Sequence, residues 1–162
     1  MQSSQPLRSI RLWLSIFIAG LILSGITAFP LELETAWLSA MLAAHPMLPT
    51  GIIEWIDRVH QALYRQSLDA PFLAYGTDWL AFAHLVLAVA FIGPLVDPVR
   101  NKWVLQFGLI ACAGVLALAL VAGPIRGIPL QWRLIDCSFG IAGAIPLLIA
   151  LRLTTQIEQS PR

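Results

Sequence analysis

The stretch WVLQFGLIACAGVLALALVAG, residues Trp103–Gly123, contains one strongly polar side chain, that of Gln106. A hydrocarbon core about 30 Å thick is crossed by about 20 predominantly apolar helical residues, and this stretch has that length. A transmembrane helix is therefore expected here.

Three further apolar stretches are long enough to span, namely LWLSIFIAGLILSGITAF (residues 12–29), FLAYGTDWLAFAHLVLAVAFIGPL (residues 72–95) and LIDCSFGIAGAIPLLIALRL (residues 134–153). The first stretch could be a signal peptide, but the bulky Ile26, three residues before Ala28, does not fit the small residues of a cleavage site. We expect an uncleaved anchor, and in total an all-α integral membrane four-helix bundle in one domain, residues 1–162.

The overall composition agrees with a membrane protein. Hydrophobic residues make up 58% and charged residues 12% of the chain, and the mean hydropathy is +0.78. These values lie outside the usual soluble range. The formal net charge is +1 and the ten Lys and Arg residues are scattered, so a nucleic-acid partner is not expected.

The connection of about 40 residues between the first two spans is long for a structureless loop. Within it, GIIEWIDRVHQALYRQ (residues 51–66) places apolar residues at helical spacing: Ile52, Ile53, Ile56, Val59 and Leu63. This pattern predicts an amphipathic helix on the outer membrane surface or capping the bundle. The preceding LELETAWLSAMLAAH is a candidate for a shorter helix that ends before Pro46.

Basic residues in short loops predict orientation, because such loops tend to stay cytoplasmic. With the N-terminus inside, the inner segments carry six: Arg8, Arg11, Arg100, Lys102, Arg152 and Arg162. The outer segments carry four: Arg58, Arg65, Arg126 and Arg133. This topology also puts Trp13 and Trp103 near the inner interface and Trp79 and Trp132 near the outer one. We expect a multi-pass protein of the bacterial inner membrane with both termini cytoplasmic.

Four charged residues then share the outer level: Asp78, Arg126, Arg133 and Asp136. One interpretation is structural, in which the two Arg neutralise the two Asp; Arg133 and Asp136 are one helical turn apart and are suited to pair. The other interpretation is a binding site for an anion such as a lipid phosphate or carboxylate, because the Arg fork matches these groups.

His84 lies about 9 Å from Asp78 along a helix that rises about 1.5 Å per residue, and therefore within the hydrocarbon layer. A neutral imidazole that donates to a carbonyl or hydroxyl on the next helix is one expectation; a proton-transferring group or a ligand is the other. Neither His45 nor His60 lies within a span to serve as a second haem ligand, so no cofactor is expected. Asp57, His60 and Tyr64 form a row that we expect to be a solvated helix edge.

Cys112 and Cys137 are expected at different membrane depths, without a disulfide, and neither has the spacing of a zinc site, so no metal is expected. Gly140 and Ala144 form a small-xxx-small pair, with Gly143 beside them, that favours close helix packing.

Two resemblances follow from these residues. The strings YGTDWLAFAH and GPIRGIPLQWRLIDCSFG resemble those of small bacterial polytopic membrane proteins. The order Asp78, His84, Arg126 or Arg133, and then Asp136 with a glycine, resembles the VanZ-like membrane proteins. The chain departs from that pattern in the wider spacing of Asp78 and His84 and in Gly140, where an Asn is expected.

Two functions are therefore predicted, and whether the protein is an enzyme stays open. The first is a non-catalytic membrane protein, free-standing or an accessory subunit of a larger membrane complex, that binds membrane lipids through an anionic headgroup. The second, which the VanZ-like resemblance implies, is an envelope-lipid enzyme or carrier. In it, Arg126 and Arg133 would hold the headgroup, and Asp78, His84 or Asp136 would move a proton.

Overall fold

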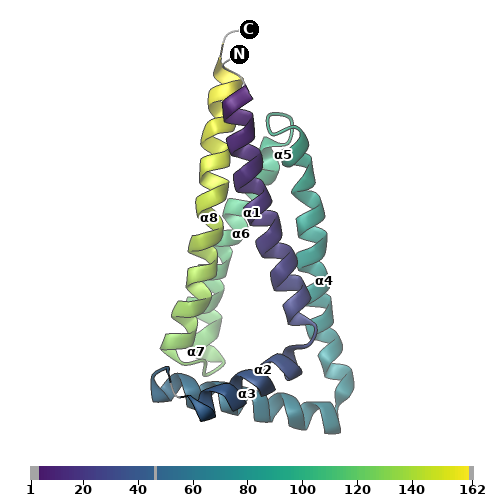
Figure 1. Ribbon diagram of the computed structural model, residues 1–162, viewed down its shortest axis with the longest axis vertical. Helices are drawn as coiled ribbons and strands as arrows, with labels where there is room; N and C mark the ends of the chain where they lie inside the picture. The colour runs from purple at the N-terminus through teal and green to yellow at the C-terminus, as the bar shows by residue number, and fades with distance from the viewer. Residues whose placement is uncertain (1–3, 46, 161–162) are drawn as a thin grey trace. The chain divides into compact units, whose positions relative to one another are not determined.

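The computed structural model describes residues 4–45 and 47–160, and every regular element in this part is helical (Figure 1). The elements, of which η1 is a 3₁₀ helix and η2 a π-helix, are α1 (Ser4–Ala28), α2 (Leu31–Ala44), α3 (Thr50–Asp69), η1 (Pro71–Leu73), α4 (Ala74–Ala90), α5 (Ile92–Val96), α6 (Lys102–Ala117), η2 (Leu118–Ala122), α7 (Gly123–Ile125) and α8 (Leu130–Gln159). Arg162 and Pro46, which entered the predictions of orientation and helix ending, lie outside the described residues.

Four helical stretches of the described chain are long and apolar enough to cross a membrane: Gln5–Ala28, Pro71–Val96, Lys102–Ile125 and Leu130–Gln159. They confirm the four predicted apolar helices, and each is longer than predicted. The fourth starts directly after Pro129, which suits a helix N-terminus because proline has no N–H to satisfy. Arg133 and Asp136 are consequently helical residues of α8.

The chain forms two compact units. The first unit holds residues up to Leu21 and from Val86 onward; the second holds Ile22–Leu85. Helices α1 and α4 each contribute to both units.

In the first unit, α6 and α8 run antiparallel. Lys102 Nζ at the start of α6 lies 2.7 Å from Glu158 Oε2 near the end of α8. Between the ends the helices approach closely at Gly140, where an added Cβ would lie 2.5 Å from Leu116 Cδ1 and 2.7 Å from the Cys112 carbonyl oxygen of α6. Small residues allow such an approach, so the packing role predicted for this glycine is confirmed.

The core of the first unit is apolar and draws on α1, α6, α8 and Phe91, which lies between α4 and α5. Its buried members are Ile10, Leu14, Phe91, Val104, Leu105, Cys112, Leu147 and Ala150. Phe17 of α1 meets Phe91 edge to face, with ring centroids 4.7 Å apart. The starts of α1 and α6 and the end of α8 lie near the same end of this unit (Figure 1).

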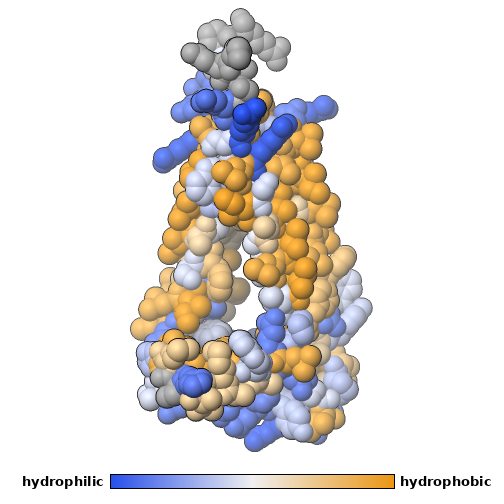
Figure 2. Space-filling model, viewed as in Figure 1, coloured by the Kyte–Doolittle hydropathy of each residue, from blue (hydrophilic) through white to orange (hydrophobic). Residues whose placement is uncertain are grey.

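The outward sides of these helices are apolar as well. Ile110, Leu118 and Phe139 are 72%, 67% and 69% exposed, and the hydrophobic colour covers the sides of the long helices (Figure 2). A water-soluble protein seldom exposes so continuous an apolar surface. The four apolar helices are thus compatible with a multi-pass membrane protein, in which lipid would cover these side chains.

In the second unit, α2 and α3 form an antiparallel pair. Leu42 and Ile56 are its buried apolar residues. Ser39 Oγ of α2 donates to Asp57 Oδ1 of α3 at 3.1 Å, and Ser67 Oγ of α3 donates to Glu32 Oε1 of α2 at 3.2 Å. Polar side chains therefore link the two helices in addition to the apolar contact.

This pair confirms helices at both predicted places in the connection, but the row of Asp57, His60 and Tyr64 differs from its prediction. Asp57 is half-buried and bonded to Ser39 and to Gln61 Nε2, and a buried His60 Nδ1 has no hydrogen-bond partner in the described structure. The expected solvated edge is therefore wrong for Asp57, which Ser39 of α2 contacts, and for the half-buried His60, and it holds for Tyr64, which is 52% exposed.

Candidate functional site

The five residues predicted for a site fall into two groups. Arg126, Arg133 and Asp136 belong to the first unit, and Asp78 and His84 belong to the second.

The first group lies around the turn between α6 and α8. The α6 helix continues through the π-helix η2 into α7, and the chain then turns sharply at Gly127, whose φ is +70°. The Ile128 N–H donates to the Gly123 carbonyl at 3.0 Å and closes the turn. The side chain of Arg126 is exposed at this turn.

The side chain of Arg133 lies across Gly123. A Cβ added to Gly123 would be 2.5 Å from Arg133 Cδ and 2.9 Å from Cγ, so the absence of a side chain at position 123 makes room for the Arg133 stem. Arg133 Nε is buried and has no hydrogen-bond partner within the described residues. The guanidinium is therefore positioned by packing, with a donor left unsatisfied.

The amino end of α8 lies next to these cations. Its N-cap is Pro129, and no side chain caps it. The first intrahelical bond of this turn runs from the Arg133 N–H to the Pro129 carbonyl at 3.1 Å, so the N–H groups of Leu130, Gln131 and Trp132 precede it. Free N–H groups at the start of a long helix carry partial positive charge and favour anions.

Asp136 is half-buried one turn further along α8, but it does not form the predicted pair with Arg133. Within residues 4–45 and 47–160 the one ion pair joins Lys102 and Glu158. This group therefore consists of two Arg side chains without an ion-pair partner, close to the N-terminus of α8, and of Asp136, which lies one turn further along that helix.

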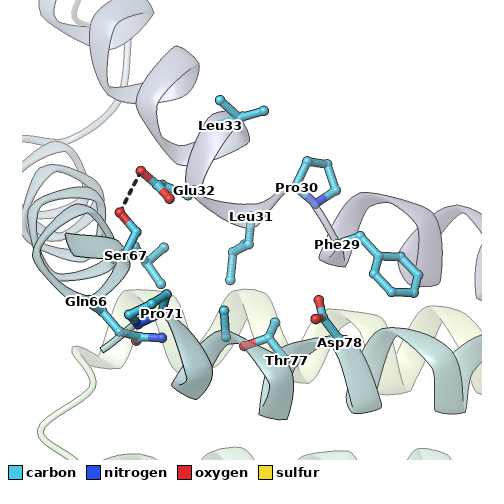
Figure 3. Close-up of a pocket in the computed structure, with 12 residues that line it drawn as sticks. Phe29, Pro30, Leu31, Glu32, Leu33, Gln66, Ser67, Pro71, Thr77 and Asp78 are labelled. Atoms are coloured by element: carbon cyan, nitrogen blue, oxygen red, sulfur yellow. Dashed lines mark hydrogen bonds between the residues drawn. The ribbon is translucent and has the colours of Figure 1, made fainter. Parts of the chain in front are cut away.

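The second group is centred on Asp78, which lines a pocket of about 290 Å³ in the second unit (Figure 3). The pocket is formed by the end of α1, the start of α2, the end of α3 and the first turns of α4. Its lining residues are Phe29, Pro30, Leu31, Glu32, Leu33, Leu63, Gln66, Ser67, Pro71, Ala74, Thr77 and Asp78.

His84 does not line this pocket. Its Nδ1 lies 2.7 Å from the carbonyl oxygen of Leu80; because a carbonyl only accepts, Nδ1 is the donor. The sequence predicted an acceptor on the next helix, whereas the acceptor is on the same helix, one turn earlier. The ring is thus bonded to the backbone of its own helix.

A candidate metal site is not found among the described residues. The described residues contain no group of three or more His, Cys, Asp and Glu side chains placed to hold a metal ion. Cys112 and Cys137 are both buried and free.

Sequence reasoning missed several residues that contact the predicted ones. Gly123 was read only as the end of the third apolar stretch, and the polar pocket residues Glu32, Gln66, Ser67 and Thr77 were not singled out. Gly123 and Arg133 are only ten residues apart in the sequence, and this short separation could have suggested that the Arg133 side chain packs on Gly123. Nothing in the sequence pairs Glu32 with Ser67, because their contact depends on how α2 packs against α3.

Comparison with known proteins leaves the family undetermined. No family model matches this chain, and no curated protein or solved structure matches it either. The resemblances noted from the sequence therefore stay predictions.

Proposed function

We propose that this protein is a small, non-catalytic polytopic membrane protein, free-standing or an accessory subunit of a membrane complex, that binds an anionic lipid headgroup at the turn between α6 and α8. The observation that carries the proposal is Arg133, whose side chain packs across Gly123 and has no ion-pair partner within the described residues.

A headgroup phosphate or carboxylate suits this geometry for two reasons. The Arg133 Nε atom is buried, so an anion would bind the terminal Nη groups of the guanidinium, whose N–H donors match phosphate and carboxylate oxygens. The exposed Arg126 and the free N–H groups of α8 add positive potential at the same turn. Asp136 opposes an anion, but it forms no ion pair with Arg133 and leaves that charge uncompensated.

The proposal includes an orientation. Both termini lie in the cytoplasm of a bacterial cell, the turn faces the outer side of the inner membrane, and the α2–α3 pair lies at the outer interface. The excess of basic residues in the segments assigned to the inside supports this orientation. A reporter enzyme fused after Arg162 that proved active on the outer side would contradict it.

The headgroup site is tested by native mass spectrometry of the full chain, extracted mildly from its own membrane. We expect a stoichiometric anionic lipid that is lost in Arg133→Gln and reduced in Arg126→Gln. Arg58→Gln, which changes an exposed Arg of α3, is the matched control and should keep the lipid. A folded Arg133→Gln protein that retained the lipid would contradict the proposal.

A further inference from the structure

We propose that the pocket of the second unit binds a primary ammonium group, with Asp78 as its principal counter-charge. This is a second site, of opposite charge preference to the α6–α8 turn and independent of the function proposed for that turn.

The polar lining of the pocket consists of groups that accept hydrogen bonds. These groups are the side chains of Glu32, Gln66, Ser67, Thr77 and Asp78. No Lys, Arg or His lines the pocket, so the two carboxylates face it without a cation from the lining. A ligand with positive charge and N–H donors complements such a lining.

The two carboxylates are not equivalent. Glu32 Oε1 accepts from Ser67 Oγ at 3.2 Å, a hydroxyl that it shares with the Tyr64 carbonyl at 2.9 Å, whereas Asp78 has no side-chain hydrogen bond or ion pair within the described part of the chain. In Figure 3 the Asp78 carboxylate lies on the side of the pocket formed by Phe29 and Pro30, and Glu32 points toward Ser67. Asp78 is half-buried and is therefore the carboxylate that gains most from a ligand.

Much of the remaining lining is apolar, including Phe29, Leu31, Leu33, Leu63 and Pro71. These walls are partly open, since Phe29 and Leu33 are 47% and 72% exposed. They offer apolar contact to the carbon chain that carries an ammonium group.

The pocket lining also favours a primary ammonium group over a quaternary one. Quaternary ammonium groups are held mainly by the faces of several aromatic rings, and Phe29 is the one aromatic residue of this pocket. A primary ammonium carries three N–H donors, as the ammonium of Lys does, and five acceptor side chains are present. The geometry therefore favours a primary amine over a trimethylammonium.

The pocket is placed where such an amine can come from two sources. It lies at the end of α1 and in the first turns of α4, two helices that are long and apolar enough to span a membrane. The ends of spanning helices lie at headgroup level, so the amine can belong to a lipid headgroup or to a small soluble molecule. The shared chemistry is the primary ammonium.

The test uses the full chain and two probes. Free ethanolamine is titrated by ligand-observed NMR into the protein in phosphatidylcholine nanodiscs, which contain no primary amine. Retention of phosphatidylethanolamine is compared with that of phosphatidylglycerol by native mass spectrometry. Asp78→Asn, which preserves shape, should weaken binding at least about tenfold, equal to about 1.4 kcal/mol. Glu54→Gln removes an exposed α3 carboxylate outside the pocket and should bind as the parent does.

A second variant tests the cavity instead of the charge. Ala74→Leu fills space at the pocket wall and leaves both carboxylates in place, so binding should again be lost; unfolding temperatures check that both variants are folded. Asp78-dependent retention of phosphatidylethanolamine alone would identify a lipid headgroup, and Asp78-dependent binding of free ethanolamine a soluble amine. The proposal is overturned if neither probe binds the parent, or if binding survives in Asp78→Asn or in Ala74→Leu.

Discussion

The helix pairs α6–α8 and α2–α3 are both antiparallel, but different forces hold them. In α6–α8 the approach is made possible by Gly140, and the ion pair between the two helices, Lys102 to Glu158, is at their ends. In α2–α3 polar links lie along the interface, from Ser39 to Asp57 and from Ser67 to Glu32. This difference fits an apolar surrounding for the first pair, where close packing of small residues drives association, and a polar surrounding for the second.

The largest effect is expected when the close approach in α6–α8 is blocked. Gly140→Leu would place a side chain against Leu116 and the Cys112 backbone, and backbone atoms cannot yield as a side chain does. Overpacking of this kind should destabilise the protein by about 3 kcal/mol. Thermal unfolding in mild detergent measures it, and Gly114→Leu, where nothing lies within 4 Å of an added Cβ, is the control. Equal unfolding temperatures for the two variants would refute the packing argument.

A smaller effect is expected from removing a polar link of α2–α3. Ser39→Ala deletes the donor to Asp57 and should cost about 1 kcal/mol, the net value of a typical hydrogen bond. Ser138→Ala is the matched change in α8, because the Ser138 hydroxyl bonds only to the carbonyl of Ile135 in its own helix at 2.6 Å. Chemical denaturation should show a lower free energy of unfolding for Ser39→Ala and almost no change for Ser138→Ala. A larger loss for Ser138→Ala would contradict the difference proposed between the two helix pairs.

Gly123→Ala should change stability less and binding more. The added methyl would meet the Arg133 stem, a flexible side chain that can move away, so the loss of stability should stay below about 1 kcal/mol. The displaced guanidinium should nevertheless lower lipid occupancy in native mass spectra. Gly20→Ala, which meets nothing within 4 Å, controls for the substitution. Unchanged occupancy in Gly123→Ala would show that the position of Arg133 does not matter for binding.

The smallest effect is expected at the ends of α6–α8. The side chains of Lys102 and Glu158 are 28% and 46% exposed, and exposed ion pairs contribute about 0–1 kcal/mol. Lys102→Met should therefore shift the unfolding midpoint only slightly, and the shift should shrink further as salt screens the pair. A loss as large as that of Gly140→Leu would mean that the end contact, and not the glycine, holds the two helices.

The candidate site could be predicted only in part. Its residue types were visible, because charged residues beside apolar runs stand out, and Arg133, Arg126 and Asp78 were all singled out. Their partners were not predicted. Arg133 was expected to pair with Asp136 one turn away, but its stem packs on Gly123 instead, and Asp78 shares its pocket with Glu32 and Ser67 from distant segments.

The amino-acid sequence by itself determined the all-helical class, the four apolar helices and the amphipathic helix of residues 51–66. These are local properties, since hydropathy and helical spacing are read along one segment at a time. Only the tertiary structure decided which faces meet: Gly140 against α6, Asp57 against Ser39, and the five polar side chains around one pocket. The rotation of a helix about its own axis is set by packing against its neighbours, and neither length nor hydropathy specifies it.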